Sequence, residues 1–178
     1  MFKVGDRIVY PMQGAGKIVG IETREILETE QQFYILKMPI ASIKISIPVN
    51  HIDSIGIRPV MSKEDGKKVM DILHSESTEM SNNWSQRYRE NLKSLKTGDP
   101  FEMAEIIRNL QVRDMEKGLS TSEKKMLNRT KKMLISELVI VGSMSTEEAQ
   151  TMIDDAITMD EDLEVQDPEG NEVLEEAE

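Results

Sequence analysis

The residue pattern of this chain changes once, at Pro59, from that of short β-strands to that of capped helices. Before Pro59, apolar and β-branched runs are short and are separated by Pro and Gly. The run Ile43–Ile47 alternates apolar and polar residues, which is typical of a strand with one buried face. Several short strands at such close spacing favour a small β-barrel. We expect strands over residues 7–10, 16–26, 32–38, 42–48 and 54–58.

Beyond Pro59, helix-capping residues recur in front of apolar stretches. The segment Asp99–Glu102 combines an N-cap aspartate, a proline at the first helical position and an acid at the third. Ser120 and Glu123 have the spacing of a capping box, and the same spacing recurs twice more. These signals predict five helices with short connections, over residues 62–74, 83–96, 100–118, 120–141 and 145–159.

The expected fold class is therefore α+β in two domains: an SH3-like or Tudor-like barrel over residues 1–58, followed by an all-α domain over residues 59–158. Residues 159–178 carry ten acidic side chains and no Lys or Arg, which predicts a disordered acidic tail. The rest of the chain has 22 basic and 23 acidic side chains. Within it, residues 84–132 hold twelve basic against seven acidic side chains, a local excess of positive charge.

Motifs of catalysis and metal binding do not fit this chain. It has no cysteine, which excludes disulfides and thiolate chemistry. Gly14-Ala15-Gly16-Lys17 departs from the phosphate-loop pattern, because Pro11 and Ile18 stand at two of its required positions. The two histidines, His51 and His74, have no ligand spacing. We expect a protein that is not an enzyme and that uses no cofactor or metal.

Two features of the sequence bear on location. No run of 18 apolar residues is present, so we expect no membrane association. The amino terminus moves directly into a strand pattern without the charged and apolar regions of a signal peptide. The expected location is the cytoplasm.

The segment around Trp84, the only tryptophan, is the candidate for nucleic-acid binding. Trp84 lies at the predicted first turn of a helix, and Arg87, Arg89 and Lys93 follow it. A helix N-terminus suits a phosphate, and an apolar ring beside it can enter the minor groove or cap an unstacked base pair.

A second interpretation of the same segment stays open. Trp84, Tyr88, Leu92 and Leu95 are spaced by four, four and three residues, so they share one helix face. A tryptophan on such a face usually lies in the core. Its position at the end of the stripe, between polar residues, would also allow the ring to overhang the edge of the domain.

The opening segment Phe2–Pro11, followed by Gly14-Ala15-Gly16, resembles the polymerase-interacting domain that CarD/CdnL proteins share with transcription-repair coupling factor. The second half also resembles CarD/CdnL proteins, and the likeness covers residues 1–158. The motifs that carry it there are Asn83-Trp84-Ser85, Arg87-Tyr88, Arg113-Asp114, Gly118-Leu119-Ser120 and Glu123–Leu127.

The resemblance implies a monomer with two partners. It implies a Tudor-like domain docked on the lobe of the RNA polymerase β subunit, in part by pairing of a sheet edge. The residues matched to that contact are Arg24 and the strand residues Ile45, Ser46, Ile47 and Pro48.

For the helical domain, the resemblance implies contact with promoter DNA just upstream of the −10 element. Trp84 matches the family tryptophan that enters the minor groove at the bubble edge and stabilises the open complex, and Arg87 and Arg89 match basic residues beside it. Gln86 and Ser46 stand where relatives carry basic residues, which lowers the expected strength of each contact.

Two alternatives remain open at this point. The helical half could bind protein rather than DNA, with Trp84 in its core, which would make the chain a Tudor-like adaptor. The acidic tail, 159–178, could serve solubility alone or compete with DNA for the basic surface.

Overall fold

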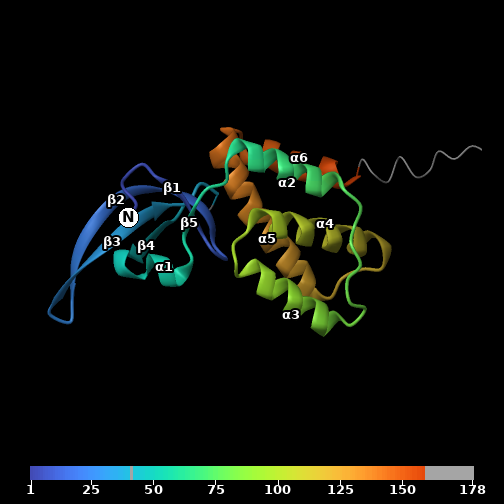
Figure 1. Cartoon of the computed structure of the whole chain (residues 1–178), viewed down its shortest axis with the longest axis horizontal. Helices are drawn as coiled ribbons and strands as arrows, with labels where there is room; N and C mark the ends of the chain where they lie inside the picture. The colour runs from blue at the N-terminus through green and yellow to red at the C-terminus, as the bar shows by residue number, and fades with distance from the viewer. Residues whose placement is uncertain (41, 159–178) are drawn as a thin grey trace, which may run out of the picture.

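The computed structural model describes residues 1–40 and 42–158. In Figure 1 the β-sheet lies on one side and the main helices on the other, with the sheet amino-terminal to the helices. The predicted acidic tail, 159–178, lies outside the described residues.

The sheet is antiparallel, with five strands in the order β4-β3-β2-β1-β5. Within the described residues, β4 and β5 do not pair with each other, so the sheet is open. The predicted SH3-like or Tudor-like barrel is therefore not confirmed, although four of the five predicted strands are. The strands are β1 (Arg7–Tyr10), β2 (Gly14–Ile26), β3 (Thr29–Lys37), β4 (Lys44–Pro48) and β5 (Arg58–Pro59).

The fifth predicted strand, over residues 54–58, is mostly wrong. The chain after β4 forms a 3-10 turn, η1 (Val49–His51), and a short helix, α1 (Ile52–Ile55). Gly56 ends that helix with φ +78°, a left-handed conformation that glycine adopts without strain. Burial of Ile52 against the sheet favours this helical turn over an extended strand, and only Arg58 and Pro59 pair with β1.

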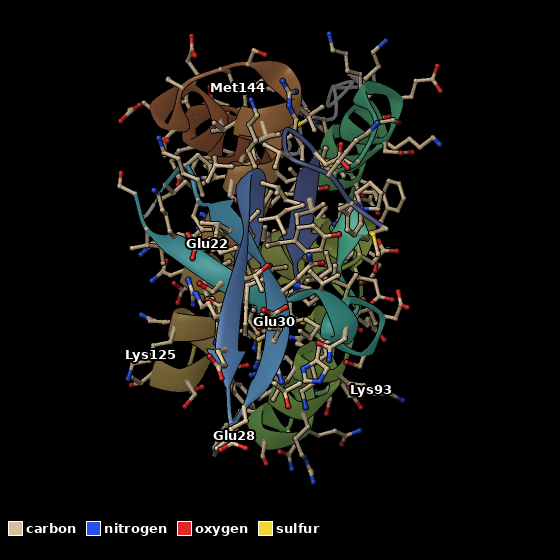
Figure 2. The ribbon with its side chains drawn as sticks, turned by 90° about the vertical axis from the view of Figure 1, so that its left-hand side faces the viewer. Glu22, Glu28, Glu30, Lys93, Lys125 and Met144 are labelled. Atoms are coloured by element: carbon tan, nitrogen blue, oxygen red, sulfur yellow. The ribbon has the colours of Figure 1, made fainter. Side chains whose placement is uncertain are left out.

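The hydrophobic core of the sheet is small. Tyr34 is buried in it, and its hydroxyl donates a hydrogen bond of 2.8 Å to the Phe2 carbonyl. The hairpin of β2 and β3 extends beyond this core to an exposed two-residue turn, Leu27-Glu28, in which both φ angles are positive. Figure 2 shows Glu28 at the tip of this hairpin. The buried core residues are Ile8, Ile18, Tyr34, Leu36, Met38, Ile47 and Ile52.

The five helices predicted after Pro59 are confirmed. All three predicted capping boxes form in full, with Ser62 and Asp65 on one helix, Ser120 and Glu123 on another, and Ser145 and Glu148 on the last. No described helix combines the length and apolar content that crossing a bilayer needs. The helices are α2 (Lys63–His74), α3 (Trp84–Leu95), α4 (Pro100–Glu116), α5 (Thr121–Gly142) and α6 (Thr146–Thr158).

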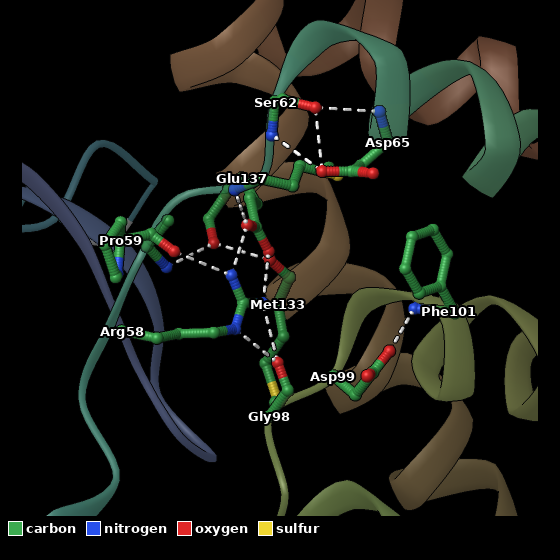
Figure 3. A network of polar contacts seen from close by, with 12 residues as sticks. Arg58, Pro59, Ser62, Asp65, Gly98, Asp99, Phe101, Met133 and Glu137 are labelled. Atoms are coloured by element: carbon green, nitrogen blue, oxygen red, sulfur yellow. Dashed lines mark hydrogen bonds and ion pairs between the residues drawn. The ribbon is translucent and has the colours of Figure 1, made fainter.

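Helix α5 joins the two halves, since it contacts the other four helices of the bundle and strand β2. Glu137 on α5 is fully buried and binds Arg58 of β5 through two hydrogen bonds of 2.7 and 2.9 Å (Figure 3). The same guanidinium donates to the Gly98 carbonyl between α3 and α4. The Ser136 hydroxyl accepts a hydrogen bond from the Ala15 amide at 2.8 Å. These bonds fix the sheet relative to the helices.

Close backbone approach at this junction depends on a glycine. Gly14 opens β2 with φ +108°, and a Cβ built there would lie 2.6 Å from the Ser136 hydroxyl oxygen. Any side chain at this position would separate β2 from α5.

Candidate functional site

Trp84 lies at the first position of α3 and is 55% exposed. The Asn83 side chain precedes it as N-cap and accepts hydrogen bonds from the Ser85 and Gln86 amides at 3.0 and 3.3 Å. Along the apolar stripe of α3, Leu95 is buried and Tyr88 is half-buried. The interpretation that places Trp84 in the core is therefore wrong. Burial along this face of α3 decreases from Leu95 to Tyr88, and Trp84 at its amino-terminal end is exposed.

The segment in front of α3 is held by two buried residues of α4. Arg108 donates to the Ile72 carbonyl at 3.1 Å and to the Ser75 hydroxyl at 2.6 Å. The Asn109 side-chain oxygen accepts from the Thr78 amide at 3.0 Å. Burial lowers the pKa of Arg108, although Glu105 counteracts this shift. These bonds fix the path of the chain on its way to Trp84.

Arg87 is only 3% exposed, so its guanidinium cannot reach a phosphate. Its Nε lies 2.6 Å from the Glu123 carboxylate of α5, and it also donates to the Ser81 carbonyl at 2.6 Å. The prediction that Arg87 contacts DNA does not fit this placement. Instead, Arg87 joins the first turn of α3 to the first turn of α5 and to the segment before Trp84.

The carboxylate that receives Arg87 is itself part of a helix cap. Glu123 accepts hydrogen bonds from the amide and hydroxyl of Ser120 at 3.1 and 2.7 Å. Burial raises the pKa of Glu123. The hydrogen bonds from Arg87 and Ser120 and the positive charge of Arg87 lower it by more than burial raises it, so the pKa of Glu123 lies below its ordinary value. The group is thus a carboxylate at neutral pH.

Exposed cations lie on the two helices α3 and α5. Arg89 and Lys93 are exposed on α3, as the sequence predicts. On α5, Lys125 helps to line a shallow groove of about 160 Å³ with Tyr88 and Leu92 of α3. Figure 2 shows Lys93 and Lys125 on opposite sides of the molecule, in the half away from Met144. We use the name α3–α5 face for the exposed surface of these two helices that carries Trp84, Arg89, Lys93 and Lys125, and its cations lie on more than one side of the helix pair.

The sequence did not identify Lys125 as a candidate binding residue, because it lies 41 positions after Trp84 on another helix. The available signal was the basic pair Lys124-Lys125 in the first turn after the capping box. Lys124 itself lies 3.5 Å from Asp114, whereas Lys125 forms no ion pair with another described residue.

The residues predicted to bind polymerase divide between the two faces of the sheet. Ile47 is 1% exposed and packs in the core of the sheet, and Ile45 packs against the same core. Ser46 is exposed and Pro48 half-buried on the opposite face, where they pair with Ile35 and Phe33 of β3. The side chain of Ile47 therefore cannot contact a partner, but β4 is an edge strand and its backbone can.

Arg24 lies on β2, on the same face of the sheet as Phe33. Its guanidinium stands 5.2 Å from the centre of the Phe33 ring and 2.6 Å from the Glu22 carboxylate. Arg24 and Glu22 are both about half exposed, so this pair contributes little to stability. The arginine is held in place and remains accessible to an acidic partner.

Comparison with known proteins gives matches over both halves. Residues 2–61 match the family model of the CarD-like/TRCF RID domain, and residues 68–154 match that of the CarD C-terminal domain. The chain is 40% identical over 151 residues to the "Putative transcription factor YdeB" of Bacillus subtilis (strain 168). That alignment covers 85% of this chain and 99% of the relative.

Proposed function

The chain belongs to the CarD family of transcription factors, and from that premise we propose that it holds RNA polymerase with its sheet and promoter DNA with its α3–α5 face. Residues 1–58 dock on the β-subunit lobe, and residues 59–158 contact the minor groove upstream of the −10 element. The exposure of Trp84 at the N-terminus of α3 is the observation that carries this proposal.

Stabilisation of the open promoter requires a preference for melted DNA. Opening is an equilibrium, and a bound protein shifts it only by binding the melted form more tightly than the paired form. The Trp84 ring has this preference if it fits only where a base step has opened. An aromatic ring has about 150–250 Å² to bury, and Trp84 is 55% exposed, so burial of its exposed part at about 25 cal/mol per Å² stabilises by roughly 2–3 kcal/mol. Unstacking of the step offsets part of this gain.

Docking on polymerase supplies the remaining affinity. A docked sheet keeps the α3–α5 face near the upstream edge of the bubble at a high effective concentration. The buried bonds between Arg58 and Glu137 fix the sheet relative to the helices, so docking also sets the orientation of Trp84. Affinity for free DNA can then be weak and independent of sequence.

Permanganate footprinting tests the proposed function as a whole. Polymerase and promoter are held at concentrations that leave the bubble partly open, and the chain is then added. We expect thymine reactivity in the bubble to rise with its concentration and to saturate. Unchanged reactivity at saturating polymerase binding would exclude stabilisation of the open complex.

We expect Lys93→Gln and Lys125→Gln each to weaken binding to free DNA at low salt. A variant that makes one phosphate contact fewer releases about one counterion fewer on binding. The slope of log K against log salt should therefore fall in magnitude by about one. Fluorescence anisotropy over a salt series measures this slope. Lys17→Gln, an exposed lysine of the sheet, is the matched control. Slopes that stay equal to the parent's would remove these lysines from the DNA contact.

We expect Arg24→Glu to abolish binding to the β-subunit lobe and to leave free-DNA binding unchanged. The change places a carboxylate beside Glu22 and reverses the charge offered to an acidic partner. A pull-down with the isolated lobe measures the effect. Lys17→Glu makes the same charge change further back on β2 and should bind normally. Normal lobe binding by Arg24→Glu would place the polymerase contact elsewhere.

A further inference from the structure

A second groove lies on the helical half, between α2, the end of α5 and α6. Its volume is about 270 Å³, and three methionines, Met70, Met144 and Met152, line it. Met144 marks its position in Figure 2, at the end of the molecule away from Lys93 and Lys125. Methionine side chains are flexible and polarisable, so a groove lined by them adapts to an apolar segment.

The charges at this groove are all of one sign. Lys63 and Lys67 of α2 are its charged lining residues, and both are exposed. Neither forms an ion pair with another described residue. The groove therefore suits a segment in which apolar and acidic residues alternate.

Such a segment follows α6 in the same chain. Helix α6 ends at Thr158, and Asp162-Leu163-Glu164-Val165 comes four residues later. Met152 lies about 9 Å back along α6 from Thr158, at 1.5 Å per helical residue. The seven residues 159–165 can span about 23–25 Å when extended. Leu163 and Val165 are thus within reach of the groove even though the chain must reverse direction.

We propose that Asp162–Val165 docks in the groove between α2, α5 and α6. Leu163 and Val165 share one side of an extended segment and cover the methionines. Asp162 and Glu164 lie on its other side, where the long side chains of Lys63 and Lys67 reach them. Docking there keeps the acidic tail away from the α3–α5 face. The inference is independent of the proposed function, because it needs neither DNA nor polymerase.

Paramagnetic NMR on the full chain tests this docking. The chain has no native cysteine, so Gln166→Cys carries a single nitroxide label next to the docking segment. We expect the methyl signals of Met70, Met144 and Met152 to lose most of their intensity relative to the reduced label. Met12 and Met126, which line the groove of the α3–α5 face, should keep theirs.

A filled groove gives the second arm of the test. Gly66 lines the groove on α2, and a Cβ there would have no atom within 4 Å, so a side chain can be added without a clash. Gly66→Leu should restore the methionine signals in the labelled chain, whereas Gly66→Ala, which adds one methyl group, should leave them broadened. Broadening at Met12 and Met126 would mean that the tail covers the α3–α5 face. That result would overturn the proposal. So would equal broadening of all methionine signals, no broadening at all, or signals of Met70, Met144 and Met152 that stay broadened in Gly66→Leu.

Discussion

Replacement of Trp84 with alanine is expected to lower the ratio of open to closed promoter about five- to thirty-fold, the equivalent of about 1–2 kcal/mol. This is the net stabilisation that remains when the cost of unstacking is set against burial of the ring. Trp84 is 55% exposed, so its removal leaves no cavity in the helical core. The variant should therefore melt like the parent and bind polymerase normally.

Permanganate footprinting of the bubble at saturating variant measures this loss. Met115→Ala truncates another exposed apolar side chain, on α4, and should behave like the parent. Trp84→Phe keeps an aromatic ring and should retain part of the effect. Full bubble reactivity with Trp84→Ala would show that the ring plays no part in opening.

Arg87→Met is expected to lower the free energy of unfolding by about 3–5 kcal/mol, the largest stability effect that we predict for one residue. The change removes the cationic partner of a fully buried carboxylate, Glu123, and leaves that charge with only the hydrogen bonds from Ser120. It also releases the Ser81 carbonyl in the segment before Trp84. Urea unfolding of both proteins measures the difference.

A double-mutant cycle separates the pair from the packing of the arginine stem. Arg87→Met combined with Glu123→Gln removes both charges and should recover part of the lost stability. The exposed pair of Lys124 and Asp114 provides the control, since Lys124→Met should cost less than about 1 kcal/mol. Equal losses in Arg87→Met and Lys124→Met would contradict a special role for the buried pair.

The dependence of stability on pH provides a further check on this pair. The pKa of Glu123 is lowered in the folded state, so its stabilising contribution is present above its ordinary pKa. That contribution is lost as pH falls through the lowered pKa of the folded state. The chain should therefore lose stability more steeply with falling pH than Glu123→Gln, which has no carboxyl group to protonate at this position.

Most of the secondary structure was predictable because its signals are local. β4 and the ends of most helices follow from alternation and capping, each of which depends on a few adjacent residues. The predicted strand over residues 54–58 failed because burial of Ile52 against the sheet is a tertiary effect. The predicted barrel is not confirmed for a related reason, since closure depends on how the edge strands meet.

The candidate site was predictable only in part, for the same physical reason. Trp84, Arg89 and Lys93 follow from one helix and lie exposed on it. The sequence gives no local signal that distinguishes Arg87 from Arg89. Arg87 forms a buried ion pair because Glu123, 36 residues away in the sequence, lies next to it in the fold, whereas Arg89 stays exposed. Lys125 comes to lie beside Tyr88 and Leu92 of α3 only through the packing of α5 against that helix.

Quenching of Trp84 fluorescence on two DNA duplexes tests the central claim most directly, since the chain has no other tryptophan. Acrylamide should quench the free protein efficiently, as expected for an exposed ring. Addition of a forked duplex should protect the ring, and a fully paired duplex of the same sequence should protect it much less. Equal protection by the two duplexes, or resistance to quenching before DNA is added, would contradict a ring that recognises the opened base step.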